Sequence, residues 1–173
     1  MSMLHTALGA VTVTPAQPDE VPLVIAILDE AAAWLQSRGI RQWPSPPPPR
    51  IWTVITQAVA QGHVYVARTQ RDGALIGTLR LTWTEPALWP HDPDGAGYVH
   101  HLAIRNHVRG YRIGALLLEW AKHHIRAAQK RYLRLDCWGE NPALCQYYEQ
   151  LGFTYCGQVQ QGPYLAARYQ LEL

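Results

Sequence analysis

Hydrophobic positions along the chain follow two different periods. Apolar residues after position 20 recur at the three- and four-residue spacing of an amphipathic helix, as at Val24, Ile25 and Leu28. We expect this helix to begin at residue 19 or 20 and to end at Gly39. A proline cluster follows at residues 45–49, which is expected to lie outside helices and central strands. The further helices expected from the same spacing are residues 51–61, 112–129 and 142–151.

Short runs of alternating or continuous apolar residues predict strands. The clearest pair flanks residues 70–73, a turn sequence that ends in Gly73 and indicates a hairpin. The strands expected are residues 9–14, 63–69, 74–83, 98–104, 132–138, 153–157 and 164–173.

The order of these elements predicts the architecture. Early strands that follow one another can pair as an antiparallel meander, whereas the strand–helix–strand unit at residues 98–138 calls for a parallel pair with a right-handed crossover. We therefore expect an α/β (α+β) fold, with a mixed, mostly antiparallel sheet of about seven strands flanked by about four helices. No linker is apparent, so residues 1–173 are expected to form a single domain.

Composition indicates that the chain folds and suggests the compartment in which it resides. Hydrophobic residues make up 48% and charged residues 16% of the 173 positions, which is typical of a globular protein. The longest apolar run, residues 21–28, is too short to span a bilayer, and the amino terminus lacks the pattern of a signal peptide. The three cysteines form no C-x-x-C pair, which favours a reducing compartment. We expect a cytoplasmic protein.

The net charge of +2 conceals an uneven distribution. Residues 1–100 carry six basic and eight acidic side chains, whereas residues 105–134 carry eight basic side chains and one acidic side chain. A basic stretch with a glycine-bearing turn could hold a phosphorylated ligand, although a charge run can also be a solvated helix face. The low overall charge argues against nucleic acid as a partner.

One segment has the shape of an anion site. A strand and a turn lead into a helix, whose first amides lack intrahelical acceptors and whose dipole favours negative charge. The segment has neither a Walker A pattern nor G-x-G-x-x-G. It consists of Arg109, Gly110, Tyr111, Arg112, Ile113, Gly114 and Ala115.

This segment resembles the acyl-CoA pyrophosphate loop of the GNAT N-acetyltransferase family, [RQ]-x-x-G-x-[GA]. A second segment, about 27 residues further on, is similar to the family signature N-x-x-A-x-x-x-Y-x-x-x-G-F. Two positions depart from the family: Arg112 replaces the usual glycine and Leu144 replaces the alanine. The residues that match the second signature are Asn141, Tyr148, Gly152 and Phe153.

The resemblance implies an acyl-CoA N-acyltransferase-like fold and direct transfer of an acetyl group from acetyl-CoA to a primary amine. It also implies that backbone groups near the end of one strand bind the pantetheine arm. The alternative is a non-catalytic acyl-CoA sensor or interaction module on the same fold. The residues assigned to the cofactor are Leu102, Ala103, Ile104, Arg109, Gly110, Tyr111, Arg112, Ile113, Gly114, Ala115, Asn141 and Tyr148.

The resemblance also suggests residues that move protons. Tyr148 could protonate the leaving thiolate, or it could pack the helix and only hydrogen-bond the sulfur. His100 or the more distant Glu85 could serve as general base. His100 and His101 are neighbours on a strand and should point to opposite faces, so that at most one faces the reaction centre. No metal site is expected.

The acceptor is expected to bind among aromatic and acidic residues, which suit a small cationic amine through cation–π contacts and ion pairing. An amino acid, a polyamine, an aminoglycoside and a protein amino terminus all stay open, so the partner is a small-molecule amine or a peptide. No membrane partner is expected, and a homodimer stays open beside a monomer. The residues assigned to the acceptor are Trp34, Trp43, Trp83, Trp89, Tyr98 and Asp92.

Overall fold

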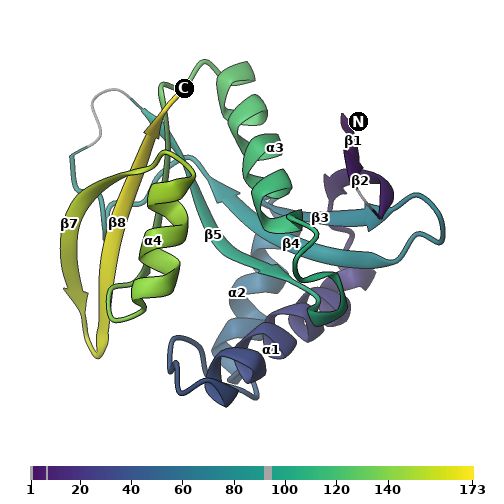
Figure 1. Cartoon of the computed structure of the whole chain (residues 1–173), viewed down its shortest axis with the longest axis horizontal. Helices are drawn as coiled ribbons and strands as arrows, with labels where there is room; N and C mark the ends of the chain where they lie inside the picture. The colour runs from purple at the N-terminus through teal and green to yellow at the C-terminus, as the bar shows by residue number, and fades with distance from the viewer. Residues whose placement is uncertain (1, 7, 92–94) are drawn as a thin grey trace. The chain divides into compact units, whose positions relative to one another are not determined.

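Hydrogen bonds pair the strands of the computed structural model in the order β1-β2-β3-β4-β5-β6-β8-β7 (Figure 1). The structure describes residues 2–6, 8–91 and 95–173. The strands are β1 (Ser2–Thr6), β2 (Gly9–Pro15), β3 (Val64–Thr69), β4 (Leu75–Thr82), β5 (Ala96–Ile104), β6 (Tyr132–Trp138), β7 (Thr154–Gln161) and β8 (Tyr164–Glu172). The helices are α1 (Val21–Ser37), α2 (Pro49–Ala60), α3 (Ile113–Ala127) and α4 (Pro142–Gln150), with short 3-10 turns η1 (Pro18–Glu20) and η2 (Asn106–Val108).

These elements confirm the predicted fold class, a mixed and mostly antiparallel sheet with four helices. Strand β1 is an addition, because a five-residue strand shows too little period to be recognised before its pairing is known. It pairs antiparallel with β2, from Ser2↔Val13 to Thr6↔Gly9.

The expectation that residues 45–49 lie outside helices is wrong at one position. Pro49 is the first residue of α2. A proline is tolerated there because its fixed φ suits a helix and its missing N–H would have no intrahelical acceptor.

The chain divides into two compact units. Residues 1–80 with 101–120 form the first unit, and residues 81–100 with 121–173 form the second. Strands β4 and β5 and helix α3 each contribute residues to both units.

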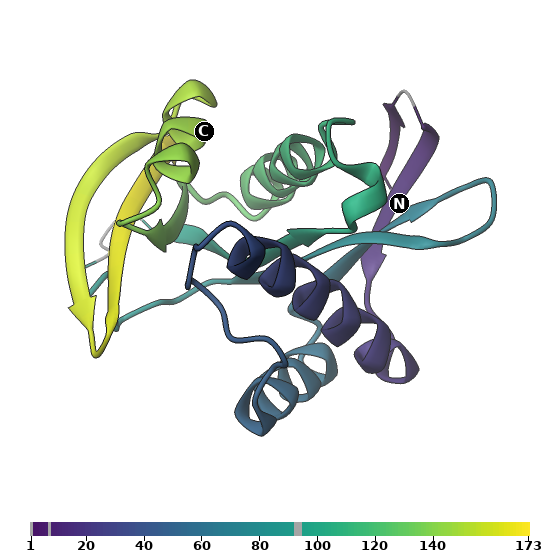
Figure 2. The same ribbon diagram turned by 60° about the horizontal axis from the view of Figure 1, so that its bottom comes forward.

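In the first unit, β1 to β4 form the expected antiparallel meander. Helices α1 and α2 lie side by side and share one hydrophobic core (Figure 2). The core-facing stripe of α1 includes Val24 and Ile27, which are fully buried, and α2 adds Ile55. The amphipathic spacing read from the sequence therefore corresponds to one buried face.

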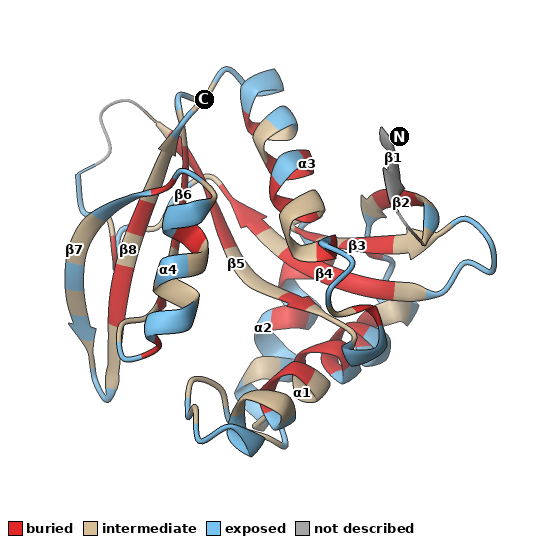
Figure 3. Cartoon of the chain, in the orientation of Figure 1, coloured by how far each residue is buried: buried red, intermediate tan, exposed pale blue. Residues whose placement is uncertain are grey.

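In the second unit, β5 and β6 form the expected parallel pair, from Ala96↔Tyr132 to Val99↔Leu135. Strand β6 pairs antiparallel with β8 along its whole length, and β8 pairs with β7. Figure 3 shows buried residues on β8 but mostly intermediate and exposed residues on β7, as expected for the edge strand in the pairing order. Among the described residues, no helix has both the length and the apolar character needed to cross a membrane.

Helix α4 has well-defined ends. The Asn141 side-chain oxygen accepts a hydrogen bond from the amide of Leu144 at 3.2 Å, and Pro142 occupies the first turn. After the helix, Gly152 adopts a φ of +88°, which glycine reaches without steric cost. Two residues of the family signature therefore fix where this helix begins and ends.

Gly97 allows the second unit to pack tightly, since a Cβ at this position would overlap the side chain of Ile125. We expect Gly97→Ala to lower the free energy of unfolding by about 1–3 kcal/mol through overpacking. Ile125→Ala alone should cost about 2–5 kcal/mol through a cavity. The double variant should lose clearly less than the sum of the two changes, as measured by urea unfolding. Simple additivity would contradict the overlap.

Candidate functional site

The predicted cofactor residues of the first unit lie at the end of β5 and in the segment that follows it. Leu102, Ala103 and Ile104 are the last three residues of the strand. The next amide, that of Arg105, donates to the Ile76 carbonyl at 2.9 Å. The chain then passes through η2 and the 109–115 loop into the first turn of α3, as the anion-site pattern requires.

Two residues of this loop, Gly110 and Arg112, have a positive φ, which is the left-handed region of backbone conformation. Gly110 has a φ of +85°, and a Cβ there would meet no atom within 4 Å, so the surface above it is open. Arg112 has a φ of +59°, although it carries a side chain. Arg112, which stands where the family pattern has glycine, thus adopts a backbone conformation that favours glycine. This conformation costs the folded protein about 1–2 kcal/mol.

Contacts with α1 hold the start of the loop in place. Glu30 accepts hydrogen bonds from the Arg105 guanidinium at 2.9 Å and from the Asn106 amide. Asn106 in turn accepts from Arg109 Nε at 2.8 Å. The Arg109 guanidinium lies 3.6 Å from the centre of the Trp34 ring, a predicted acceptor residue that here contacts the loop.

The residues of this segment fit an anionic cofactor. Its charged members are Arg109 and Arg112, and the first turn of α3 carries the positive end of the helix dipole. Tyr111 is 43% exposed, Ile113 is buried, and Gly114 and Ala115 lie at intermediate depth in the first turn. Their assignment to acetyl-CoA stays a prediction.

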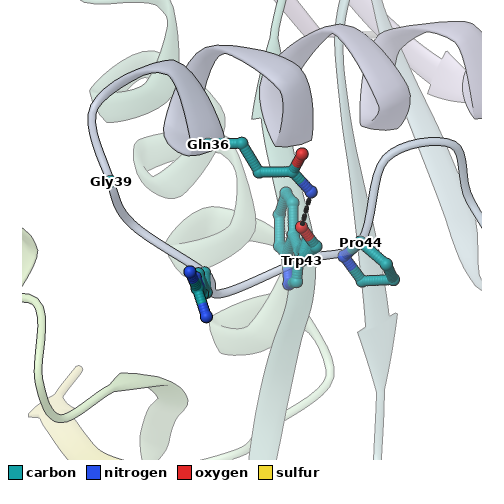
Figure 4. A pocket seen from close by; sticks show the side chains of 5 residues that line it. Gln36, Gly39, Trp43 and Pro44 are labelled. Carbon is teal, nitrogen blue, oxygen red and sulfur yellow. Dashed lines mark hydrogen bonds between the residues drawn. The ribbon is translucent and has the colours of Figure 1, made fainter.

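A groove of about 590 Å³ lies after the end of α1 (Figure 4). Gln36 Nε2 donates to the Trp43 carbonyl at 3.0 Å and so fixes one wall. The Trp43 ring also lies 6.3 Å from the His101 ring, measured between centroids. The groove is lined by Gln36, Gly39, Arg41, Trp43 and Pro44.

His101 is a buried histidine whose pKa lies well below its ordinary value. Burial, assisted by the charge of Arg80, lowers its pKa to about 4, so the imidazole is neutral at pH 7. Its φ of +50° interrupts the regular strand geometry. The expectation that at most one of His100 and His101 faces the reaction centre stays a prediction.

The second unit brings two predicted catalytic residues together. His100 Nε2 lies 3.2 Å from Glu85 Oε2 and 3.3 Å from Thr82 Oγ1. On the other side of the ring, His100 Nδ1 lies 3.9 Å from Asp136 Oδ1. Tyr164 donates a hydrogen bond of 2.9 Å to the second oxygen of Asp136. The result is a polar cluster of partly buried side chains that can accept and hold protons.

Tyr148, the third predicted catalytic residue, is a buried residue of α4. Its ring packs against Phe153, at a centroid distance of 5.7 Å, and against Tyr169 at 5.9 Å. Burial, followed by the charges of neighbouring groups such as Cys137 and Asp136, raises the pKa of Tyr148 well above its usual range. The hydroxyl therefore keeps its proton at neutral pH, as a general acid must.

The remaining predicted acceptor residues have diverse surroundings. The rings of Trp83 and His124 stack with their centroids 6.1 Å apart. The centroid of the Trp89 ring lies 4.5 Å from Cζ of Arg134. Tyr98 is only 1% exposed, and its hydroxyl accepts a hydrogen bond from Arg134. Asp92 lies outside the described residues. The assignment of these residues to an acceptor stays a prediction.

Sequence reasoning missed Asp136 and Tyr164. Asp136 is the acidic residue of a strand whose other members, apart from Arg134, are apolar or aromatic, and this signal could have drawn attention to it. Tyr164 has no comparable signal, because only the pairing of β6 with β8 brings it near Asp136. No cluster of potential metal ligands occurs in the described part of the chain.

The family follows from comparison with known proteins. The model of the acetyltransferase (GNAT) family matches residues 27–153, which is more than half of the chain. The chain belongs to the GNAT acetyltransferase family. As a GNAT protein, it is 29% identical over 154 residues to the uncharacterized N-acetyltransferase YesJ of Bacillus subtilis (strain 168), covering 87% of this chain and 86% of that protein.

Solved GNAT structures share the fold. An acetyltransferase from Listeria monocytogenes 4b F2365 superposes with a TM-score of 0.80 at 23% identity, over 99% of this chain and 100% of that chain. The structure of yncA from Salmonella typhimurium, with its cofactor acetyl-CoA, has a TM-score of 0.64 at 17% identity, over 94% and 93% of the two chains. The predicted acyltransferase fold is thereby confirmed.

The left-handed conformation of Arg112 in this GNAT loop makes a measurable prediction. We expect Arg112→Gly to raise the free energy of unfolding by about 1 kcal/mol relative to Arg112→Ala, because only glycine relieves the strained φ. Both variants remove the same charge, so the difference in stability between them, measured by chemical denaturation, reports the backbone conformation alone. Equal stability of the two variants would contradict the strain.

The buried His101 predicts a pH dependence of stability. Its folded pKa of about 4 lies below the ordinary value of 6.5, so the unfolded chain binds a proton that the folded chain excludes. Its contribution is complete above pH 6.5 and is lost as the pH falls toward 4, at up to about 1.4 kcal/mol per pH unit. His101→Asn should flatten this part of the stability curve, whereas the exposed His123→Asn should leave it unchanged. Parallel curves for wild type and His101→Asn would contradict the assignment.

Proposed function

We propose that this protein is a cytoplasmic, acetyl-CoA-dependent N-acetyltransferase that moves an acetyl group directly to the primary amine of a small molecule. The observation that carries the proposal is the contact of two proton acceptors, with His100 Nε2 lying 3.2 Å from Glu85 Oε2. Membership of the acetyltransferase family supports the same conclusion.

The proposed cofactor residues would act through charge and backbone. Arg109 and Arg112 would neutralise phosphate charge, and the amides of Ile113, Gly114 and Ala115 would donate hydrogen bonds to phosphate oxygens. Acetyl-CoA supplies an activated thioester when bound. The open surface above Gly110 supports close approach of a ligand to the backbone.

The proton chemistry would use the second unit. An ammonium group must lose a proton before its nitrogen can attack a carbonyl carbon. Glu85 and His100 would accept this proton, since their contact at 3.2 Å lets one group stabilise the charge of the other. Tyr148 would hold a proton at its hydroxyl for the departing sulfur.

The acceptor class is inferred from charge. Two carboxylates, Glu85 and Asp136, face the same imidazole and are 21% and 15% exposed, which favours a cationic acceptor over an anionic one. A small amine that is protonated in water fits this charge.

The direct test is an assay of thiol release from acetyl-CoA with a panel of primary amines, together with thermal unfolding in the presence of acetyl-CoA. The proposal expects a thermal shift and amine-dependent release of free thiol. A thermal shift without transfer to any amine would favour an acyl-CoA sensor instead. No thermal shift would contradict both functions.

Tyr148→Phe separates the acid role from packing, because it removes only the hydroxyl of a buried ring. We expect kcat to fall about 100-fold, the lower end of what general acid catalysis contributes, with little change in CoA affinity. Gly114→Asp should instead weaken CoA binding, because it places a negative charge in the phosphate loop.

The matched control is Tyr155→Phe, since Tyr155 is 49% exposed on β7 and should tolerate the change with unaltered kcat. An active Tyr148→Phe enzyme with wild-type kcat would show that the hydroxyl is not the proton donor.

A further inference from the structure

The His100 ring lies between two carboxylates that come from different elements of the second unit. Glu85 follows β4 and approaches Nε2 at 3.2 Å, and Asp136 lies on β6 and approaches Nδ1 at 3.9 Å. Both nitrogens of the imidazole therefore face an acidic oxygen. The two approaches are not equivalent, because 3.2 Å allows a hydrogen bond whereas 3.9 Å is an electrostatic contact.

This arrangement selects one orientation of the ring. A rotation of the imidazole by half a turn would place ring carbons where the nitrogens now face Glu85 and Asp136. The loss of both polar contacts disfavours the rotated ring. The orientation of His100 thus depends on a carboxylate that the proposed proton transfer does not itself use.

Asp136 is in turn held by Tyr164, whose hydroxyl donates to Oδ2 at 2.9 Å and leaves Oδ1 to face His100. Burial, and next the charge of Asp136, raises the pKa of Tyr164 far above its ordinary value, so the donor keeps its proton. The backbone is equally fixed, because Asp136 pairs with Arg168 in the β6–β8 ladder. Tyr164 itself begins β8, at the hairpin with β7.

We propose that Asp136, anchored by Tyr164, is a positioning residue that sets the orientation of His100. The inference rests on the proposed function, in which His100 and Glu85 accept the proton of the amine. In this scheme Asp136 exchanges no proton itself and acts through His100, while its charge also contributes to the raised pKa of Tyr148. Thr82 completes the surroundings of the ring, at 3.3 Å from Nε2.

The test uses Asp136→Asn, an isosteric change that keeps an oxygen to accept from Tyr164 but removes the charge facing Nδ1. We expect kcat to fall about tenfold or more, with the KM for the amine and the affinity for CoA changed less than about twofold. Tyr164→Phe, which frees the Asp136 carboxylate, should change kcat in the same direction by a smaller factor. The controls are Asp19→Asn and Tyr155→Phe, since both residues are exposed.

A second readout does not depend on catalysis. In protein labelled with ¹⁵N-histidine, the chemical shifts of the ring nitrogens report which nitrogen carries the proton, and His100→Gln identifies the His100 signals. We expect Asp136→Asn to change the His100 signals, because the group that faces Nδ1 loses its charge, while Asp19→Asn leaves them unchanged. Thermal unfolding verifies that the variants are folded.

The two measurements separate the possible failures. Changed ¹⁵N shifts in a protein without transferase activity would overturn the proposed function and keep the positioning role. Unchanged shifts in Asp136→Asn, or a kcat equal to that of the wild type in an active enzyme, would overturn the positioning role of Asp136.

Discussion

Close approach of helix α3 to the strands is the constraint on which much of the structure depends. At Gly77, in the first unit, an added Cβ would lie 3.0 Å from the Leu117 side chain and 3.2 Å from the carbonyl of Ala103. At Gly97, in the second unit, the Ile125 side chain occupies the space of a Cβ. Helix α3 therefore packs against a glycine in each unit, at a position where a Cβ would crowd or overlap its side chains. In the first unit, this packing fixes the start of α3 and with it the exit of the 109–115 loop.

The fold could be predicted largely because local signals agreed with one another. Glu20 precedes the first residue of α1, and the helix ends shortly before Gly39, as its apolar period indicated. The motif residues Asn141 and Gly152 also have physical roles, as a cap and as a left-handed turn. Such features are readable because each depends on neighbours in the sequence.

The candidate site was less predictable, because its geometry depends on residues distant in the sequence. Glu85 and His100 could be named separately, but their contact at 3.2 Å requires the course of the chain after β4. Asp136 and Tyr164 are 28 positions apart and meet only through strand pairing. The positive φ of Arg112 could not be predicted either. The sequence shows that an unusual residue stands at this position, but residue preferences do not predict a left-handed conformation for arginine.

The contacts between α1 and the 105–109 segment have a consequence for ligand affinity. Glu30 and Trp34 hold Arg105, Asn106 and Arg109 before any ligand arrives. The conformational entropy of these side chains is therefore lost when the protein folds and not when an anion binds. Pre-organisation of this kind links the strength of binding to the integrity of a helix about 75 residues earlier in the chain, whose residues need never touch the ligand.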